Sequence, residues 1–168
     1  MSPCNLSLSR MEPDQDVVLR NLFEYYVHDM AEWFEIDTKA DGSYSYDTSS
    51  VWNNGCEAWL AKLGDSIAGF AVIGPAVKWS DPIPAFDVHE FFVIRRYRRH
   101  GLGAAMSTRL WDAHPGEWLV RVVEANAVAT RFWRTSIATY SSGAYVEQVR
   151  IVNNRRWIFF RFTSGPSR

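Results

Sequence analysis

The stretch FFVIRRYRRHGLGAA, residues 91–105, carries the residue types best suited to hold a phosphate. A hydrophobic run leads into Arg98-x-x-Gly101-x-Gly103, and small residues that favour a helix start follow it. Glycines let a backbone approach a phosphate closely, and the N–H groups and positive dipole end of a helix favour an anion. Arg98 and Arg99 add charged hydrogen-bond donors. The pattern therefore predicts an anion-binding turn between a strand and a helix.

Two other phosphate motifs are excluded by this stretch. No Gly-Lys-Ser/Thr follows the glycines, so the turn is not a P-loop. A dinucleotide fingerprint needs three glycines and has no use for the leading arginine. The six-residue match is weak alone, but a second pattern, Asn126-x-x-Ala129-x-x-Phe132-Trp133, directly follows the next hydrophobic run.

With these two patterns the chain resembles the GNAT superfamily of N-acetyltransferases. In that family R/Q-x-x-G-x-G/A binds the pyrophosphate of acetyl-CoA. The fuller pattern V-x-P-x-x-R-x-x-G-x-G overlays Val93 to Gly103, with Arg95 in place of the proline. The family's N-x-x-A-x-x-F-Y is met except that Trp133 replaces the tyrosine. The order of elements resembles the family over roughly residues 5–162, whereas the specific motifs are confined to these two stretches.

The resemblance implies acetyl-CoA as the co-substrate and no metal. It implies that the pantetheine arm lies along the main chain of 91–93, that the pyrophosphate meets the amides of 99–104, and that Asn126 and its helix flank the other side. Arg131 or Arg134 would reach the nucleotide phosphates. The implied contacts of acetyl-CoA are Phe91, Phe92, Val93, Arg98, Arg99, His100, Gly101, Leu102, Gly103, Ala104, Asn126, Ala129, Phe132 and Trp133.

Acetyl transfer to an amine needs a base, because an ammonium group has no lone pair. Glu90 is the best candidate, since the resemblance places it on the strand beside the acetyl group. Asp87 and His89 are alternatives on the same strand, on the opposite face if the strand pairs regularly. The ordinary roles of such residues are a salt-bridged strand carboxylate and a hydrogen-bonded core histidine.

The leaving thiolate must be protonated or stabilised. The family often uses a tyrosine at the position of Trp133, and an indole cannot donate a proton near neutral pH. Tyr140 is the nearest replacement by position, and Tyr145 is another. A thiolate held by backbone dipoles could also leave unprotonated. The catalytic prediction is Glu90 as base and Tyr140 as acid, and an acetyl-CoA-binding fold without catalysis is the alternative.

Acidic and aromatic residues alternate in the first helix and in the loop that follows it. Carboxylates among aromatic rings suit a cationic amine, through ion pairs and cation–π contacts. The expected acceptor is therefore an amine of a small molecule or a peptide. The predicted acceptor contacts are Glu24, His28, Glu32 and Trp33.

The net charge of −1 hides a strong charge division. Residues 1–84 carry five Lys and Arg against thirteen Asp and Glu, a charge of −8, and residues 85–168 carry thirteen Arg against six acids, a charge of +7. The positive half holds the phosphate turn, and the acidic half supplies the acceptor side. The basic run 95–100 is too short, in a chain that is not basic overall, to favour nucleic-acid binding.

Hydrophobic periodicity predicts one mixed α/β domain over residues 1–168, with a core of about 5–162. The order is β-α-(α)-β-β-β-α-β-α-β-β, and the resemblance adds a central mixed sheet that splays between the fourth and fifth strands. After Pro13, a helix of about four turns is expected, capped by Asp14 or Asp16. Strands are expected at 5–11, 57–63, 66–77, 85–94, 118–124, 144–152 and 156–162, later helices at 101–111 and 127–139, and a short helix within the loop 36–55.

Composition sets the remaining limits. A chain that is 47% hydrophobic and 15% aromatic is not disordered. Cys4 and Cys56 form neither a disulfide framework nor a metal-ligand spacing, which favours a reduced, cytoplasmic setting. The first ten residues lack a signal-peptide core, and no apolar run has the length of a membrane span. We expect a cytoplasmic protein with no membrane or nucleic-acid partner. The sequence is compatible with either a monomer or a homodimer.

Overall fold

The structure is a computed structural model that describes residues 5–44, 46–76 and 84–165. Every expected helix and strand is present, although the ends differ by a few residues. Cys4 and Val77, the expected end of one strand, lie outside the described residues. The elements are β1 (Leu6–Arg10), η2 (Pro13–Gln15), α1 (Asp16–Met30), α2 (Ser49–Asn53), β2 (Glu57–Leu63), β3 (Ser66–Pro75), β4 (Phe86–Val93), η3 (Arg95–Tyr97), α3 (Leu102–Ala113), β5 (Gly116–Val123), α4 (Ala127–Tyr140), β6 (Tyr145–Val152) and β7 (Arg155–Ser164).

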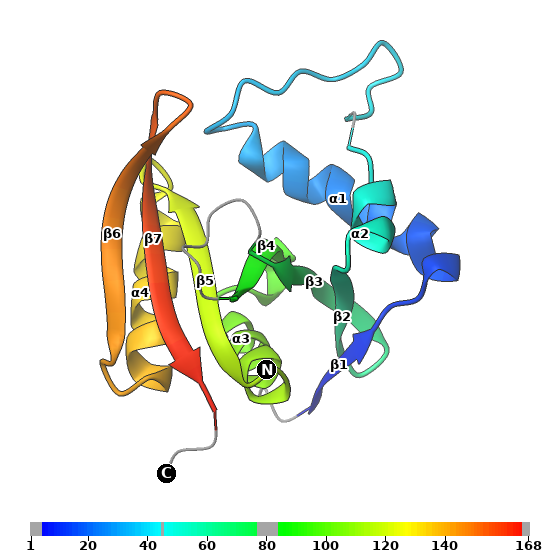
Figure 1. Cartoon of the computed structure of the whole chain (residues 1–168). Helices are drawn as coiled ribbons and strands as arrows, with labels where there is room; N and C mark the ends of the chain where they lie inside the picture. Colours follow the sequence, from blue (N-terminus) through cyan, green and yellow to red (C-terminus); the bar gives the residue numbers. More distant parts are fainter. Residues whose placement is uncertain (1–4, 45, 77–83, 166–168) are drawn as a thin grey trace.

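The strands form one seven-stranded sheet in the order β1-β2-β3-β4-β5-β7-β6 (Figure 1). All neighbouring strands are antiparallel except β4 and β5. Those two parallel strands pair only at Phe86–Val88 against Trp118–Val120 and then separate. The predicted splay between the fourth and fifth strands is therefore confirmed, and it opens the middle of the sheet.

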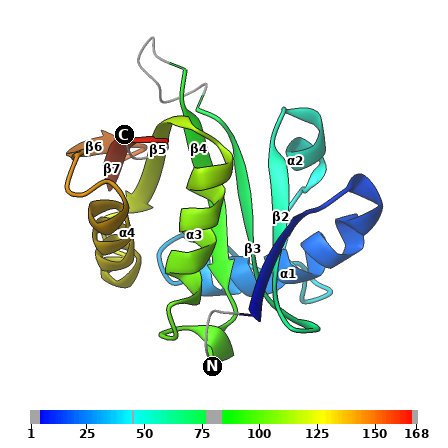
Figure 2. The ribbon, with the colours of Figure 1, turned by 90° about the horizontal axis from the view of Figure 1, so that it is seen from below.

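Helices cover both faces of the sheet. Alternate residues of β3 show this, because Phe70 packs with α1 whereas Ala71 packs with α3 and α4. Figure 2 shows α3 alongside β4 and α4 alongside β6 and β7. Large side chains at the centre of these layers, such as Phe23 in α1 and Trp111 in α3, are almost fully buried. None of the described helices is long and apolar enough to cross a membrane.

The start of α1 differs from the expected cap. The prediction that Asp14 or Asp16 caps this helix is wrong, because the N-cap residue is Gln15. Asp16 instead accepts hydrogen bonds from Thr48 Oγ1 and Trp52 Nε1, each at 2.7 Å. The carboxylate thus ties the start of α1 to the long loop and α2.

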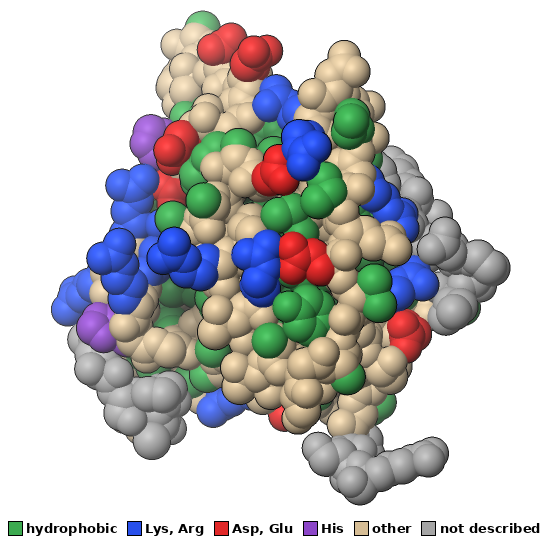
Figure 3. Space-filling model, turned by 90° about the vertical axis from the view of Figure 1, so that its left-hand side faces the viewer, with side chains coloured by type: hydrophobic (Ala, Val, Ile, Leu, Met, Phe, Trp, Pro, Cys, Tyr) green, Lys and Arg blue, Asp and Glu red, His purple; other side chains and the backbone are tan. Residues whose placement is uncertain are grey.

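Tight turns set the register of the two hairpins. Gly64, between β2 and β3, has φ +58°, and Asn153 and Asn154, between β6 and β7, have φ +50° and +58°. Two consecutive residues with positive φ are the geometry that the right-handed twist of a two-residue hairpin favours. Figure 3 faces the side on which α4, β6 and β7 lie. The edge strand β6 exposes Val146, Val149 and Ile151.

Candidate active site

A β-bulge in β4 decides which side chains meet at the splay. Glu90 pairs with Val72 of β3, but the next pair is Val88 with Ile73, so His89 is an extra residue. Asp87 pairs with Gly74, two residues from Val72. Because residues two apart on a strand share a face, Asp87 and Glu90 lie on the same face of the sheet, that of α1. We expected Asp87 on the face opposite Glu90 if the strand paired regularly. The bulge breaks the regular pairing, so that expectation does not apply.

Glu90 lies in a half-buried, tyrosine-lined position. The hydroxyl of Tyr46 donates to Glu90 Oε1 at 2.7 Å, and the hydroxyl of Tyr26 is a second hydrogen-bonding neighbour. Burial raises the pKa of Glu90, and the two tyrosines and Arg121 only partly offset this. The same burial, with the carboxylate beside them, raises the pKa of both tyrosines, which stay protonated. A carboxyl group with a raised pKa is suited to exchange protons near neutral pH.

The two alternative bases have other surroundings. Asp87 is fully buried and forms an ion pair with Arg121, with Oδ2 and Nη2 2.6 Å apart, so its carboxylate is already neutralised. Burial lowers the pKa of His89, although Asp87 opposes this, and its Nε2 atom has no hydrogen-bond partner among the described residues. Glu90 therefore remains the best placed of the three as a base.

A cleft of about 500 Å³ lies in the splay and contains Glu90. One of its walls comes from β4, β5 and α4. The opposite wall comes from α1, from the segment after it and from β7. Its lining residues are Tyr26, Val27, Met30, Phe34, Ile36, Asp37, Tyr46, Val88, His89, Glu90, Phe91, Val120, Arg121, Val122, Val123, Asn126, Ala129, Trp133 and Trp157.

The cofactor side has an unpaired strand edge. Residues 91–93 pair with β3 on one side, whereas the described ladder with β5 ends at Val88. An extended chain could therefore pair with this edge of β4, as expected for pantetheine. Asn126, Ala129 and Trp133 line the cleft opposite it, and Asn126 caps α4 by accepting a hydrogen bond from the Ala129 amide at 2.9 Å.

The turn before α3 has the geometry of an anion site. Arg99 and Gly101 both have positive φ, +65° and +76°, and α3 begins at Leu102. The first four N–H groups of a helix have no partner inside it, so they are available to an anion. Gly103 has a different reason to lack a side chain, because a Cβ there would lie 3.0 Å from Cε2 of Phe132.

Arg98 does not point to this turn as expected. Its Nε donates to the carbonyl of Val93 at 2.7 Å, and its Nη2 lies 2.5 Å from Oδ2 of Asp29. Arg95 binds the other oxygen of Asp29 at 2.6 Å. The arginine that we predicted to contact phosphate therefore positions the turn against α1, and Arg99 and His100, which are exposed, are left as the candidates for phosphate contact.

Arg134, one of the two arginines expected at the nucleotide phosphates, is also engaged elsewhere. Its Nη2 lies 2.6 Å from Glu147 of β6, in an ion pair between α4 and the edge of the sheet. Arg131 is exposed on the same helix and keeps the expected role as a prediction.

Tyr140 is not in the cleft. It lies at the end of α4, where its hydroxyl donates to Asp112 at 2.8 Å, and burial together with this carboxylate raises its pKa to about 12. Its ring packs on Trp111, and Tyr145 packs on Phe160. The prediction that Tyr140 is the catalytic acid is therefore wrong, because α4 carries it away from the splay.

The predicted acceptor residues lie on the expected elements but outside the cleft. Glu24 accepts a hydrogen bond from the Tyr44 amide at 2.9 Å, and His28 Nδ1 lies 3.1 Å from the Tyr44 hydroxyl. Glu32 is exposed, and neither it nor the Trp33 side chain lines the cleft. We therefore correct all four predictions: Glu24 and His28 hold the loop onto α1, and none of the four side chains is among the described residues that line the cleft.

Sequence reasoning missed the side chains that line the cleft on the side of α1. Tyr26 and Met30 are four residues apart, so they share the face of α1 that meets the cleft. Phe34 and Asp37 follow α1, and Trp157 comes from β7, more than a hundred residues later. The spacing on α1 could have been noticed, whereas nothing in the sequence joins Trp157 to it.

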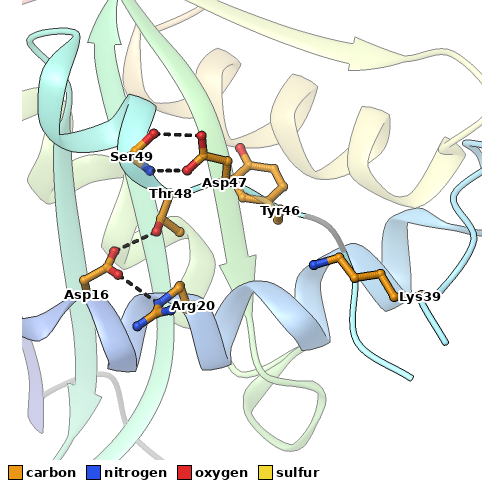
Figure 4. A pocket seen from close by; sticks show the side chains of 7 residues that line it. All are labelled: Asp16, Arg20, Lys39, Tyr46, Asp47, Thr48 and Ser49. Carbon is orange, nitrogen blue, oxygen red and sulfur yellow. Dashed lines mark hydrogen bonds and ion pairs between the residues drawn. The ribbon is translucent and has the colours of Figure 1, made fainter. Parts of the chain in front are cut away.

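A second cavity, of about 440 Å³, lies on the outer side of α1 (Figure 4). Its carboxylates already have partners. Asp16 binds Arg20 at 2.8 Å and Thr48, and Asp47 binds the amide and hydroxyl of Ser49. Tyr46 lines both cavities. The residues around this second cavity therefore hold the loop that carries Tyr46 in place.

Comparison with protein-family models shows to which family the chain belongs. The model of the acetyltransferase (GNAT) family matches residues 23–136, more than half of the chain. The chain belongs to the GNAT family of acetyltransferases. The match covers both the turn before α3 and the start of α4, and the resemblance seen in the two sequence patterns is confirmed. No curated protein sequence matches this GNAT chain.

Solved structures of the GNAT fold superimpose on nearly the whole chain. Spermidine N-acetyltransferase of Vibrio cholerae, with CoA and spermine, has a TM-score of 0.63 and 11% identity, covering 95% of this chain and 96% of that chain. Salmonella typhimurium yncA, with acetyl-CoA, has a TM-score of 0.61 and 12% identity, covering 97% and 96%. Ribosomal-protein-alanine N-acetyltransferase of Brucella melitensis has a TM-score of 0.62 and 13% identity, covering 94% and 99%. At such identity these structures show the fold.

Proposed function

We propose that this GNAT chain transfers the acetyl group of acetyl-CoA to a primary amine by direct attack within a ternary complex. One observation carries the proposal: Glu90, with a raised pKa and two tyrosine neighbours, lies in the cleft where β4 and β5 separate. Acetyl transfer needs a base that deprotonates the amine. Glu90 lies between an unpaired strand edge that suits the cofactor and a second wall that suits an acceptor.

The chemical step balances with the groups present. Glu90 takes a proton from the acceptor ammonium, which leaves a neutral amine with a lone pair. The amine nitrogen attacks the thioester carbonyl, the C–N bond forms, and the C–S bond breaks as its electron pair leaves with sulfur. The second amine proton passes to the thiolate or to solvent. No metal is needed for these steps, and we propose none.

Acetyl-CoA fits the residues on the other wall. The edge of 91–93 accepts the pantetheine arm, the amides of 99–104 face its pyrophosphate, and the wall of Asn126, Ala129 and Trp133 lies opposite. Support comes from the yncA structure, which holds acetyl-CoA in the same fold. Phe132 acts indirectly, since its ring stacks on Phe91 at 5.9 Å between centroids and packs on Gly103.

A second candidate function is acetyl-CoA binding without transfer. The observation that favours it is Trp133, which lines the cleft where the family often has a tyrosine acid. The only tyrosines among the described cleft residues, Tyr26 and Tyr46, are both neighbours of Glu90. Under the main proposal the thiolate leaves without a dedicated tyrosine acid, stabilised by backbone dipoles.

Thiol release from acetyl-CoA, measured across a panel of amines and across pH, tests the proposal. The wild-type rate should rise along an acid limb whose midpoint lies above the usual glutamate range. The Glu90→Gln variant should lose roughly 10²–10⁴-fold in kcat/KM together with that limb. Glu12→Gln, on the exposed turn before α1, should leave both unchanged. An unchanged profile in Glu90→Gln removes Glu90 as the base, and binding of acetyl-CoA without turnover of any amine favours the second function.

A further inference from the structure

The acceptor wall of the cleft is apolar and aromatic. Met30, Phe34, Ile36 and Trp157 line it and are all half-buried, so part of each side chain faces open space. The rings of Phe34 and Trp157 lie 5.9 Å apart between centroids, in a tilted contact. These rings join the segment after α1 to β7 and form a continuous apolar surface beside Glu90.

Charges near this wall do not suit a polycation. Among the described lining residues, Glu90 and Asp37 are the only carboxylates, and Asp37 is exposed. Arg121, paired with Asp87, also lines the cleft, so this pair adds no net negative charge for an ammonium group. Arg155 adds another cation, 5.2 Å from the centre of the Phe34 ring, and donates to the Trp33 carbonyl at 2.6 Å.

The acidic residues of the first half of the chain lie elsewhere. Glu24 is bound to the Tyr44 amide, and Asp29 holds two arginines of the phosphate turn. Asp16 and Asp47 line the second cavity and are bound to their own neighbours. A ligand with several ammonium groups needs a row of carboxylates, whereas a ligand with one ammonium group needs only Glu90.

We propose that the acceptor is a monoamine with a compact apolar or aromatic body, of the arylalkylamine class. This inference rests on the proposed acetyl transfer. The single amine meets Glu90, and the apolar body packs on Met30, Phe34, Ile36 and Trp157, where its burial drives binding. A cleft of about 500 Å³, shared with the acetyl end of the co-substrate, holds a small molecule of this kind.

The first experiment compares three acceptors with acetyl-CoA at saturation: 2-phenylethylamine, spermidine and a tetrapeptide with a free N-terminus. The kcat/KM for 2-phenylethylamine should exceed that for each of the others by about 10-fold or more, because the apolar wall discriminates in its favour. A higher kcat/KM for spermidine or for the peptide overturns the acceptor assignment and leaves the proposed transfer intact.

Variants then locate the binding surface. Trp157→Ala and Phe34→Ala should raise the KM for 2-phenylethylamine by about 10-fold with little change in kcat, since both remove apolar contact and neither touches the reacting atoms. Tyr25→Ala is the matched control, because this ring is 64% exposed on α1 and lies outside the lining of the cleft. A KM that is equal in all three variants contradicts the assignment.

A binding measurement keeps the two proposals separate. Calorimetry with the protein saturated with CoA should detect 2-phenylethylamine, and Trp157→Ala should weaken that binding, whether or not turnover occurs. Binding of acetyl-CoA with no binding of 2-phenylethylamine overturns the acceptor class alone. Failure to bind acetyl-CoA overturns the proposed function itself.

Discussion

The pKa of Glu90 depends on burial and on its two tyrosine neighbours. The hydrogen bonds from Tyr46 and Tyr26 stabilise the ionised form and so lower the pKa that burial raises. Tyr46 comes from the long loop and is held by its stacking on Phe23, with ring centroids 4.0 Å apart. The loop therefore reaches Glu90 through a single hydroxyl group.

Tyr46→Phe should therefore shift the acid limb of the pH–rate profile to higher pH. Removal of the hydrogen bond destabilises the carboxylate, the pKa of Glu90 rises further, and less of the base is ionised at neutral pH. At pH well above the limb, the rate should return to near the wild-type value. A profile measured from pH 5 to pH 9 checks this, and a limb that moves to lower pH would contradict it.

At the level of elements, Asp29 connects α1 to the phosphate turn. Its two oxygens bind Arg95 and Arg98, and its side chain is only 12% exposed. These hydrogen bonds lower the pKa of Asp29 even though burial acts to raise it. The helix that lines one wall of the cleft and the turn proposed to face the co-substrate therefore share one carboxylate.

Asp29→Asn should lower the free energy of unfolding by about 2 kcal/mol at pH 7. Because the pKa of Asp29 is lower in the folded state, its stabilisation is present above the unfolded pKa of about 3.9 and fades as pH falls through the folded pKa. Urea unfolding at pH 7 and pH 3 should show a smaller difference from wild type at pH 3. Asp14→Asn, on the exposed turn, is the control and should change little at either pH.

Hydrophobic period and turn residues were enough to predict every α-helix and strand, since Gly64 and the pair Asn153–Asn154 mark their hairpins clearly, but they did not predict the short 3-10 helices η2 and η3. They could not predict the bulge, because an extra His89 looks like any other residue of an apolar strand. They could not predict where Arg98 points either, because its partner Asp29 lies 69 residues away and outside any local motif. The sequence therefore predicts the turns and the strand edge formed by the backbone. It does not predict which side chains far apart in the chain bind each other.

On the scale of the whole molecule, the sheet consists of two parts joined by only three residue pairs between β4 and β5. Arginines of the basic half also bind across to the acidic half, as Arg98 does with Asp29 and Arg155 with the Trp33 carbonyl. These contacts, together with the sheet, join the two halves of the chain, and Asp29 supplies the charge on the acidic side. A co-substrate that lies in the splay would add contacts to both parts.

Acetyl-CoA should therefore stabilise the whole fold. At 100 times its Kd it should add about 2.7 kcal/mol, which raises Tm by about 5–10 °C for a chain of this size. Gly101→Val should lose most of this shift, because valine strains the positive φ of the phosphate turn. Gly143→Val carries the same kind of strain at φ +84°, remote from the turn, and should lose stability but keep the shift. Equal shifts in the two variants would contradict the phosphate assignment.

The bulge in β4 also has a consequence for how this chain can evolve. Substitutions along the strand change one side chain at a time, whereas regular pairing of all of 87–90 with β3, without the bulge, would change the facing of several at once. Asp87 and Glu90 would then point to opposite faces, and they would no longer share the face of α1 although neither residue had been substituted. The shared face of the two carboxylates therefore survives the loss of the bulge residue itself, but not a shift of register that pairs His89 with β3.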